Sequence, residues 1–187
     1  MLILHTLHGT TRHLSTFFHA KEDRIIDLKS KPSKLKATIA NCPKDEYIVL
    51  LGCGNKNGLH CPSENTYSSP ELIPFGPEEL ELLRNHGNKL IGIWQDARSF
   101  ARKHRLSGLF TGRLITNCQE AESYGIITLQ HIIEEYNGIL FRLLRQLLDE
   151  GHGLSGIPAR LEKLYLSRTG TLLFNSDTFR YISSTKK

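Results

Sequence analysis

The cysteine at position 53 lies in the stretch of the chain that is best suited to chemistry. It follows an apolar run, Tyr47 to Leu51, and is flanked by Gly52 and Gly54, with Gly58 four residues beyond Gly54. An apolar run this short suits a buried strand rather than a buried helix. Glycine adopts backbone conformations that other residues avoid, and it leaves room for a ligand or another segment. We therefore expect the thiol at the tip of a central strand, where open α/β sheets form their sites.

A thiol at this tip could act as a nucleophile if a base lies nearby. A free cysteine has a pKa of about 8.5, so Cys53 needs a neighbour to be largely ionised at neutral pH. The nearby histidines that could supply this help are His60, His5 and His8. The simpler interpretation is an unreactive cysteine in a tight turn, and the sequence leaves both open.

Two other kinds of site fit the residues of this stretch less well. Cys53, His60 and Cys61, with Cys118, offer zinc ligands, but the adjacent His60 and Cys61 depart from the usual C-x(2–4)-C spacing. The glycines of residues 52–58 are similar to a dinucleotide-binding turn, but they depart from G-x-G-x-x-G and follow the third expected strand rather than the first. We therefore predict neither a metal site nor a cofactor.

A second polar tip follows a later apolar run. Residues Lys89 to Trp94 predict a strand that ends at Gln95 and Asp96. Because parallel strands end at the same edge of a sheet, we expect both tips at one edge, where a cleft can form. The candidate ligand-binding residues of this cleft combine the glycines with nearby polar side chains: Gly52, Gly54, Asn55, Asn57, Gly58, His60 and Asp96.

The elements that must position these tips alternate along the chain. Short apolar runs at 2–7, 24–28 and 47–52 predict strands, and helical patterns separate them at 14–18 and 32–39. This order is typical of a parallel sheet covered by helices. We predict a single α/β domain over residues 1–187, a three-layer αβα sandwich with a mostly parallel sheet.

The rest of the chain continues this pattern with interruptions. An irregular loop is expected at 60–75, a helix at 97–104 and a turn at 109–112. The longest periodic segment, 129–148, predicts a long amphipathic helix whose apolar face packs on the core. A C-terminal hairpin is expected at 161–181, with strands at 163–166 and 171–174.

The composition is that of a soluble globular chain. Of 187 residues, 39% are hydrophobic, and four cysteines are too few for a disulfide framework at this length. No apolar run is long enough to span a membrane, and the first residues lack the features of a signal peptide. We expect a cytoplasmic protein. A net charge of +5 permits contact with nucleic acid without indicating it, and nothing predicts an oligomeric state.

The two strand tips together resemble those of the caspase-like cysteine peptidases of clan CD, in particular compact bacterial homologues. In that family one apolar strand ends in His-Gly, and a later one ends in the nucleophilic cysteine. Gly54 stands where the glycine after the histidine would be, and Lys89 to Trp94 resembles the nucleophile strand. Phe100 to Ile115 resembles the segment after that strand. The resemblance covers roughly residues 1–140 and implies a caspase-like fold. It also implies that the strands at 47–52 and 90–94 are adjacent and parallel, so that Cys53 and Gln95 line one cleft.

The resemblance breaks at the residues that carry the chemistry of the family. Cys53 occupies the histidine position, and Gln95 occupies the cysteine position. A glutamine side chain is neither an activated nucleophile nor a general base. We therefore expect a catalytically degenerate protein that binds or regulates through the cleft, with a protein or peptide as its partner. The alternatives are an active cysteine hydrolase that uses Cys53, and a module that binds nucleotide or nucleic acid.

Overall fold

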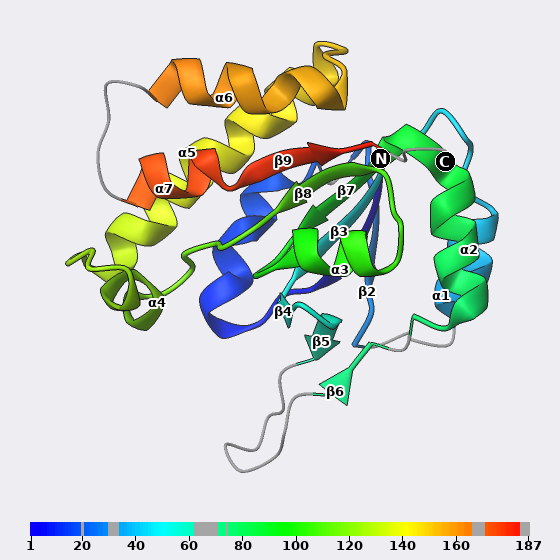
Figure 1. Ribbon diagram of the computed structural model, residues 1–187, viewed down its shortest axis with the longest axis horizontal. Coiled ribbons are helices and arrows are strands. Elements are labelled where there is room, and N and C mark those ends of the chain that lie inside the picture. The colour runs from blue at the N-terminus through cyan, green and yellow to red at the C-terminus, as the bar shows by residue number, and fades with distance from the viewer. Residues whose placement is uncertain (20, 30–33, 62–70, 74, 166–170, 184–187) are drawn as a thin grey trace.

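A six-stranded sheet stands at the centre of the computed structural model, which describes residues 1–19, 21–29, 34–61, 71–73, 75–165 and 171–183 (Figure 1). The strand order is β2-β1-β3-β7-β8-β9. Neighbouring strands are parallel except for β8 and β9, which are antiparallel. The predicted mostly parallel α/β sheet is therefore confirmed. The strands are β1 (Leu2–Thr6), β2 (Arg24–Asp27), β3 (Ile48–Gly52), β7 (Leu90–Ile93), β8 (Gly108–Thr111) and β9 (Phe179–Ile182).

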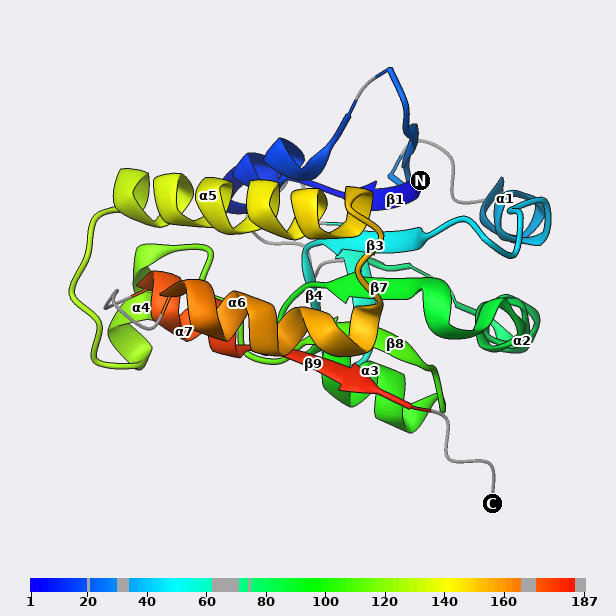
Figure 2. The same cartoon turned by 90° about the horizontal axis from the view of Figure 1, so that it is seen from above.

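Helices cover both faces of this sheet. The core on one face includes residues of η1 (Gly9–Phe17), α5 (Gln130–Asp149), η4 (Leu154–Gly156) and α6 (Ile157–Tyr165). The core on the other face includes residues of α1 (Leu35–Ala40), α2 (Pro77–His86) and α3 (Ala97–Lys103). Figure 1 shows α1 and α2 to the right of the sheet and α5 and α6 at its upper left, and Figure 2 shows the same elements from above. The predicted three-layer αβα sandwich is confirmed. The remaining helical segments are η3 (Gly87–Lys89), α4 (Cys118–Ser123) and α7 (Thr171–Asp177).

Alternate residues of the central strand enter the two cores. In β3, Val49 and Leu51 pack in the core that contains η1 and α5, whereas Ile48 and Leu50 pack in the core that contains α1 and α2. Successive side chains of a strand point to opposite faces of a sheet. Both faces are covered here and all of β3 is buried, which explains why its sequence is a continuous apolar run.

The long helix predicted at 129–148 is confirmed as α5. Its buried positions follow a helical spacing and include Ile133, Leu140, Leu144 and Leu147. The stripe packs against η1 and the sheet. None of the described helices, α5 included, combines the length and the apolar character that a membrane span requires.

A small antiparallel sheet continues directly from the tip of β3. Its order is β4-β5-β6, and its strands are β4 (Gly54–Asn55), β5 (Gly58–Cys61) and β6 (Glu71–Leu72). It lies below the main sheet in Figure 1. The irregular loop predicted at 60–75 is therefore wrong where β5 and β6 fall within it. Residues 62–70 and 74 lie outside the described residues.

The C-terminal hairpin predicted at 161–181 is wrong. Helix α6 extends to Tyr165 and helix α7 begins at Thr171, whereas the prediction placed strands at 163–166 and 171–174. Residues 166–170 lie outside the described residues. Ile157 and Leu161, four residues apart, lie on one face of α6, and both are fully buried in the core. The strand that follows, β9, pairs with β8 instead of with a hairpin partner.

The turn predicted at 109–112 is also wrong, because Gly108–Thr111 forms strand β8. All four of its residues are buried, and it lies between β7 and β9. A four-residue strand flanked by glycines has a local pattern that also fits a turn. The two neighbouring strands decide the outcome, because they offer hydrogen bonds along both edges.

Candidate functional site

The two strand tips meet, as the sequence predicts. β3 and β7 are adjacent and parallel, with Leu51 opposite Ile93. The residues that follow the two strands therefore leave the sheet side by side. Cys53 and Gln95 line one cavity of about 170 Å³, which we name the strand-tip cleft. Its lining residues are mostly polar and come from five separate segments: Thr11, Gly52, Cys53, Gly54, His60, Gln95, Thr116, Asn117 and Glu120.

The glycines at the tip of β3 have a packing role. Gly52 has a φ of +143°, and a Cβ atom there would lie 2.5 Å from Thr6 Oγ1. A Cβ atom on Gly54 would lie 2.2 Å from Cδ1 of the buried Trp94. Both positions exclude any larger residue unless neighbouring atoms move. The space beside these glycines, which the sequence suggested for a ligand, is thus occupied by Thr6 and Trp94.

Four of the predicted ligand-binding residues do not line the cleft. Asn55 and Asn57 are exposed at the turn between β4 and β5, where the Asn57 amide donates to Asn55 Oδ1 at 2.8 Å. Gly58 is buried and pairs with Asn55 across this hairpin. Asp96 adopts a left-handed conformation with φ of 62° ahead of α3, and its amide donates to the Gly112 carbonyl at 2.7 Å. Of the predicted set, Gly52, Gly54 and His60 do line the cleft with Cys53 and Gln95.

Cys53 is half-buried, and its surroundings hold the thiol protonated. Burial raises its pKa, the charge of Glu120 raises it further, and hydrogen bonds from Thr11 and the His8 backbone offset only part of this. The Sγ atom lies 3.3 Å from Thr11 Oγ1. A thiolate, the form that attacks carbonyl carbon, is therefore disfavoured at neutral pH.

His60 lies beside Cys53 without activating it. Its backbone amide donates to the Cys53 carbonyl at 3.0 Å, and its side chain lines the same cleft. Burial lowers the pKa of His60, so the imidazole is neutral at pH 7. In the described part of the chain, no hydrogen bond joins the His60 ring to Cys53 Sγ. A neutral imidazole and a protonated thiol do not form the ion pair of a cysteine hydrolase.

Gln95 uses its side chain to position the opposite wall of the cleft. Its Oε1 atom accepts a hydrogen bond from the Leu114 amide at 2.7 Å. This bond ties the tip of β7 to the loop 112–117, which follows β8. The loop is held from behind by Asn175, which donates to the Ile115 carbonyl and accepts from the Ile115 amide, both at 2.8 Å. The fully buried Asn137 also donates to the Ile115 carbonyl, at 2.9 Å.

The sequence analysis missed four residues of the cleft: Thr11, Thr116, Asn117 and Glu120. Asn117 caps α4, and its side chain accepts from the Glu120 amide at 2.9 Å. The Glu120 carboxylate in turn accepts from the Thr116 amide at 2.6 Å and from its hydroxyl at 3.0 Å. The Asn117-x-x-Glu120 spacing is typical of a helix start, so a search for caps would have found the pair. Nothing local indicates that Thr11, from η1, lies beside them.

The cleft retains hydrogen-bonding groups that the protein does not use. Within the described residues, the side-chain nitrogens of Gln95 and Asn117 and the second carboxylate oxygen of Glu120 have no hydrogen-bond partner. The first two groups donate and the third accepts. No group of three or more histidine, cysteine, aspartate or glutamate side chains in the described part of the chain could hold a metal ion. The arrangement therefore suits a small neutral or cationic group with both a donor and an acceptor.

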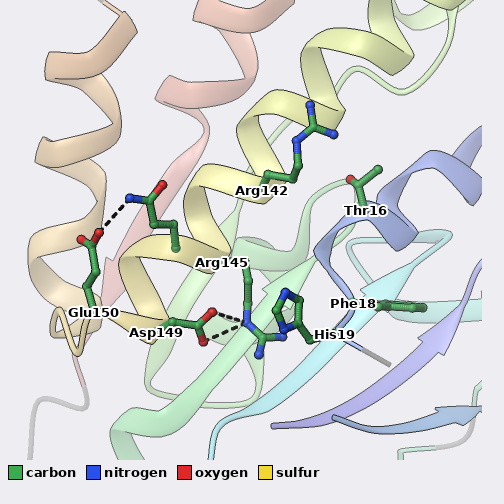
Figure 3. A pocket seen from close by; sticks show the side chains of 8 residues that line it. Thr16, Phe18, His19, Arg142, Arg145, Asp149 and Glu150 are labelled. Carbon is green, nitrogen blue, oxygen red and sulfur yellow. Dashed lines mark hydrogen bonds and ion pairs between the residues drawn. The ribbon is translucent and has the colours of Figure 1, made fainter. Parts of the chain in front are cut away.

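A larger hollow of about 550 Å³ lies between η1 and α5, and we name it the α5 groove (Figure 3). Arg145 has a buried side chain whose guanidinium donates to Asp23 at 2.5 Å and to both oxygens of Asp149 at 2.8 and 2.9 Å. Glu22 lies 3.6 Å away. These carboxylates compensate the charge of Arg145, so this cluster joins α5 to the start of β2. The lining residues of the groove are Thr16, Phe18, His19, Arg142, Arg145, Gln146, Asp149 and Glu150.

Comparison with models of known protein families and with curated protein sequences finds no match for this chain.

Proposed function

We propose that this chain is a catalytically degenerate, caspase-like protein that binds a peptide segment of a partner protein through the strand-tip cleft. One observation carries the proposal: the two strand tips that bear the catalytic pair of the family line one cavity here, at Cys53 and Gln95. The resemblance requires this adjacency, because the paired residues of the family act on one bond.

Binding rather than turnover follows from the chemistry of these two positions. Gln95 has no nucleophilic atom, and its carbonyl oxygen is already bonded to the Leu114 amide. Burial raises the pKa of the Cys53 thiol, and the neutral His60 does not offset this. The Gly54 position of the family remains, but neither member of the pair does.

A peptide suits the unused groups of the cleft. Each peptide unit presents one N–H donor and one carbonyl acceptor. The amide nitrogens of Gln95 and Asn117 can donate to a carbonyl, and Glu120 can accept from an N–H group. A cavity of about 170 Å³ has room for a single side chain or a chain end rather than for a folded surface.

The test is a binding screen against a random peptide library, with thermal melts to show that each variant folds. We expect Gln95→Met and Glu120→Gln to weaken the selected peptides on the order of tenfold, because each change removes one hydrogen bond. Asn57→Ala is the matched control, since Asn57 is polar and nearby but lies outside the cleft. Peptides that bind all three variants as tightly as wild type, or an absence of binding peptides, would contradict the proposal.

An active cysteine hydrolase is the second candidate, because Cys53 and His60 line the same cleft. The proposed function expects no turnover of a broad peptide library by the purified protein. Turnover that is lost in Cys53→Ala and kept in Cys118→Ala would establish the hydrolase instead.

We also infer a cytoplasmic location. The described cysteines Cys42, Cys53 and Cys118 are free thiols, which is the usual state in a reducing compartment. A bacterial source is implied only by the resemblance. Labelling of all cysteines in freshly lysed cells by a thiol reagent, without added reductant, tests the reduced state.

A further inference from the structure

A third hollow lies at the opposite ends of the strands from the strand-tip cleft. It has a volume of about 330 Å³ and is lined by Arg84, Lys103, His104 and Arg105, which we name the basic hollow. Arg84 belongs to the last turn of α2, ahead of β7. Lys103 ends α3, and His104 and Arg105 belong to the connection from α3 to β8. The hollow therefore lies at the amino ends of β7 and β8, whereas the cleft lies at the carboxyl end of β7.

The positive charges of the basic hollow have no negative partners in the part of the chain that the structure describes. Within the described residues, Arg84, Lys103 and Arg105 form no ion pair, and all three are exposed. The Nε atom of Arg84 donates to the His104 carbonyl at 3.0 Å, which fixes the guanidinium beside α3. Its two terminal nitrogens have no hydrogen-bond partner among the described residues. Exposed cations elsewhere do pair, as Arg180 does with Asp177 at 2.8 Å.

Helix dipoles explain only part of this charge. Basic residues are favoured at helix C-termini, and α2 and α3 both end here. Each helix end contributes about −0.5 of an elementary charge. Two ends therefore offset about one charge, against three full charges on Arg84, Lys103 and Arg105. The hollow keeps a positive potential after this correction.

Arg105 occupies a position that suits glycine. Its φ is +55°, in the left-handed region, and it follows the C-terminus of α3. The Leu106 amide closes the helix by donating to the Ala101 carbonyl at 2.9 Å, a geometry in which glycine is the usual residue. An arginine here is held in a less favourable backbone conformation, and that conformation directs a third cation to the hollow.

The pKa of His104 depends on the charges of the hollow. Burial lowers its pKa, and the charges of Lys103 and Arg84 lower it further. Its ring packs on the Phe100 ring with centroids 4.5 Å apart, so the imidazole is held at the wall of the hollow. An anion bound among these residues would favour the imidazolium form and raise the pKa again.

We propose that the basic hollow binds a compact phosphate-bearing anion, with Arg84 and Arg105 as its principal donors. Guanidinium groups donate in pairs to phosphate oxygens, and such charge-assisted hydrogen bonds are strong. The volume of about 330 Å³ is at the lower end of small-molecule sites and fits one or two phosphoryl groups with little else. The basic hollow shares no lining residue with the strand-tip cleft, so this proposal does not depend on the proposed function.

The first experiment is calorimetric titration with inorganic pyrophosphate at constant ionic strength. We expect saturable binding to the wild type and a loss of affinity on the order of tenfold in Arg105→Gly and in Lys103→Ala. Arg102→Ala is the matched control, because Arg102 lies in the same turn of α3 and is exposed, but does not line the hollow. We expect its affinity to match that of the wild type. Adenosine diphosphate, titrated in parallel, shows whether a nucleoside adds to the affinity of the phosphates.

The second experiment follows the histidine rings by NMR as the pH is varied. We expect pyrophosphate to raise the pKa of His104 and to leave that of His60, in the strand-tip cleft, unchanged. A shift of His60 without one of His104 would place the anion in the cleft and overturn the proposal. This readout does not depend on any variant folding.

Other outcomes would also overturn the proposal. One is wild-type protein that shows no saturable binding of pyrophosphate, and another is an equal loss of affinity in Arg102→Ala and Arg105→Gly. Tight binding of a single-stranded oligonucleotide that falls equally in those two variants would indicate a diffuse surface for nucleic acid.

Discussion

The α5 groove and the basic hollow are both lined by arginine, but the groove contains carboxylates that pair with an arginine and the hollow is lined by basic residues alone. In the groove, Arg145 is buried and its charge is compensated by Asp23, Asp149 and Glu22. In the hollow, Arg84 and Arg105 are exposed and form no ion pair among the described residues. The same residue type therefore serves two purposes in one small domain.

This difference separates charge that the fold needs from charge that it does not need. A buried arginine without partners would be strongly unfavourable, so the fold depends on its pairing with the buried Asp23. Exposed cations remain hydrated, and the fold gains little by pairing them. Cations that gather in a hollow without pairing remain available to a ligand. Four predictions follow the comparison from the largest expected effect on stability to the smallest.

Replacing the buried arginine should have the largest effect. Arg145→Met removes the guanidinium from the Asp23 side chain, which is 0% exposed, and leaves it only the Met1 ammonium group at 3.1 Å. Removal of one partner of a buried ion pair lowers the free energy of unfolding by about 3–5 kcal/mol. Urea denaturation measures this change. Arg142→Met is the matched control on the same helix and groove, since Arg142 is exposed and should change stability by less than about 0.5 kcal/mol. Equal effects of the two changes would remove the distinction between buried and exposed arginine.

The Arg145 cluster should also set the response to acid. Burial alone would raise the pKa of Asp23, but hydrogen bonds from Arg145 and the His19 amide outweigh burial and lower it. The unfolded chain then binds the proton first, with a pKa of about 3.9, so this stabilisation is complete above that pH. It should be lost as the pH falls from there through the lowered folded-state pKa. Denaturation curves between neutral pH and acid measure the loss. If the free energy of unfolding of Asp23→Asn falls with pH as steeply as that of the wild type, the acid response belongs to other groups.

Arg105→Gly should stabilise the protein while it weakens anion binding. The residue has a φ of +55°, which glycine adopts without strain. We expect the free energy of unfolding to rise by about 0.5–1 kcal/mol, because the relief of strain exceeds the entropy that glycine adds to the unfolded chain. Thermal melts without phosphate measure this. A clear loss of stability would mean that the Arg105 side chain supports the fold.

Lys103→Ala should have the smallest effect on stability. The side chain is exposed and forms no ion pair in the described part of the chain, so the change should stay within about 0.5 kcal/mol in either direction. Urea denaturation measures this change, and repeating it at several salt concentrations provides a second check on the free energy of unfolding. A large loss would show that Lys103 has a structural role like that of Arg145.

Local patterns were sufficient where an element is decided by its own side chains. The run from Ile48 to Leu51 becomes a central strand, because an apolar segment of that length is stable only when both of its faces are covered. Helix α5 was predicted almost to its ends, because twenty residues contain enough turns for the period to stand out.

Local patterns failed where a segment depends on its neighbours. Residues near 163 and 171 have the apolar content of strands, but the adjoining sheet edge is occupied by β9, which pairs with β8. Gly108–Thr111 has the glycine of a turn, but it fills the gap between β7 and β9. Short segments contain too few residues for their period to decide between these states.

The sequence by itself determined the alternation of strands and helices, the adjacency of β3 and β7, and the meeting of Cys53 with Gln95. The alternation follows from apolar periodicity, and the other two follow from the resemblance of the two strand tips to a known pair of motifs. Only the tertiary structure decided that Trp94 and Thr6 fill the space beside the glycines, that Thr11 and Glu120 complete the cleft, and that Arg84 joins Arg105 in a hollow. Those residues are far apart in the chain, and the folded backbone alone brings them within contact distance.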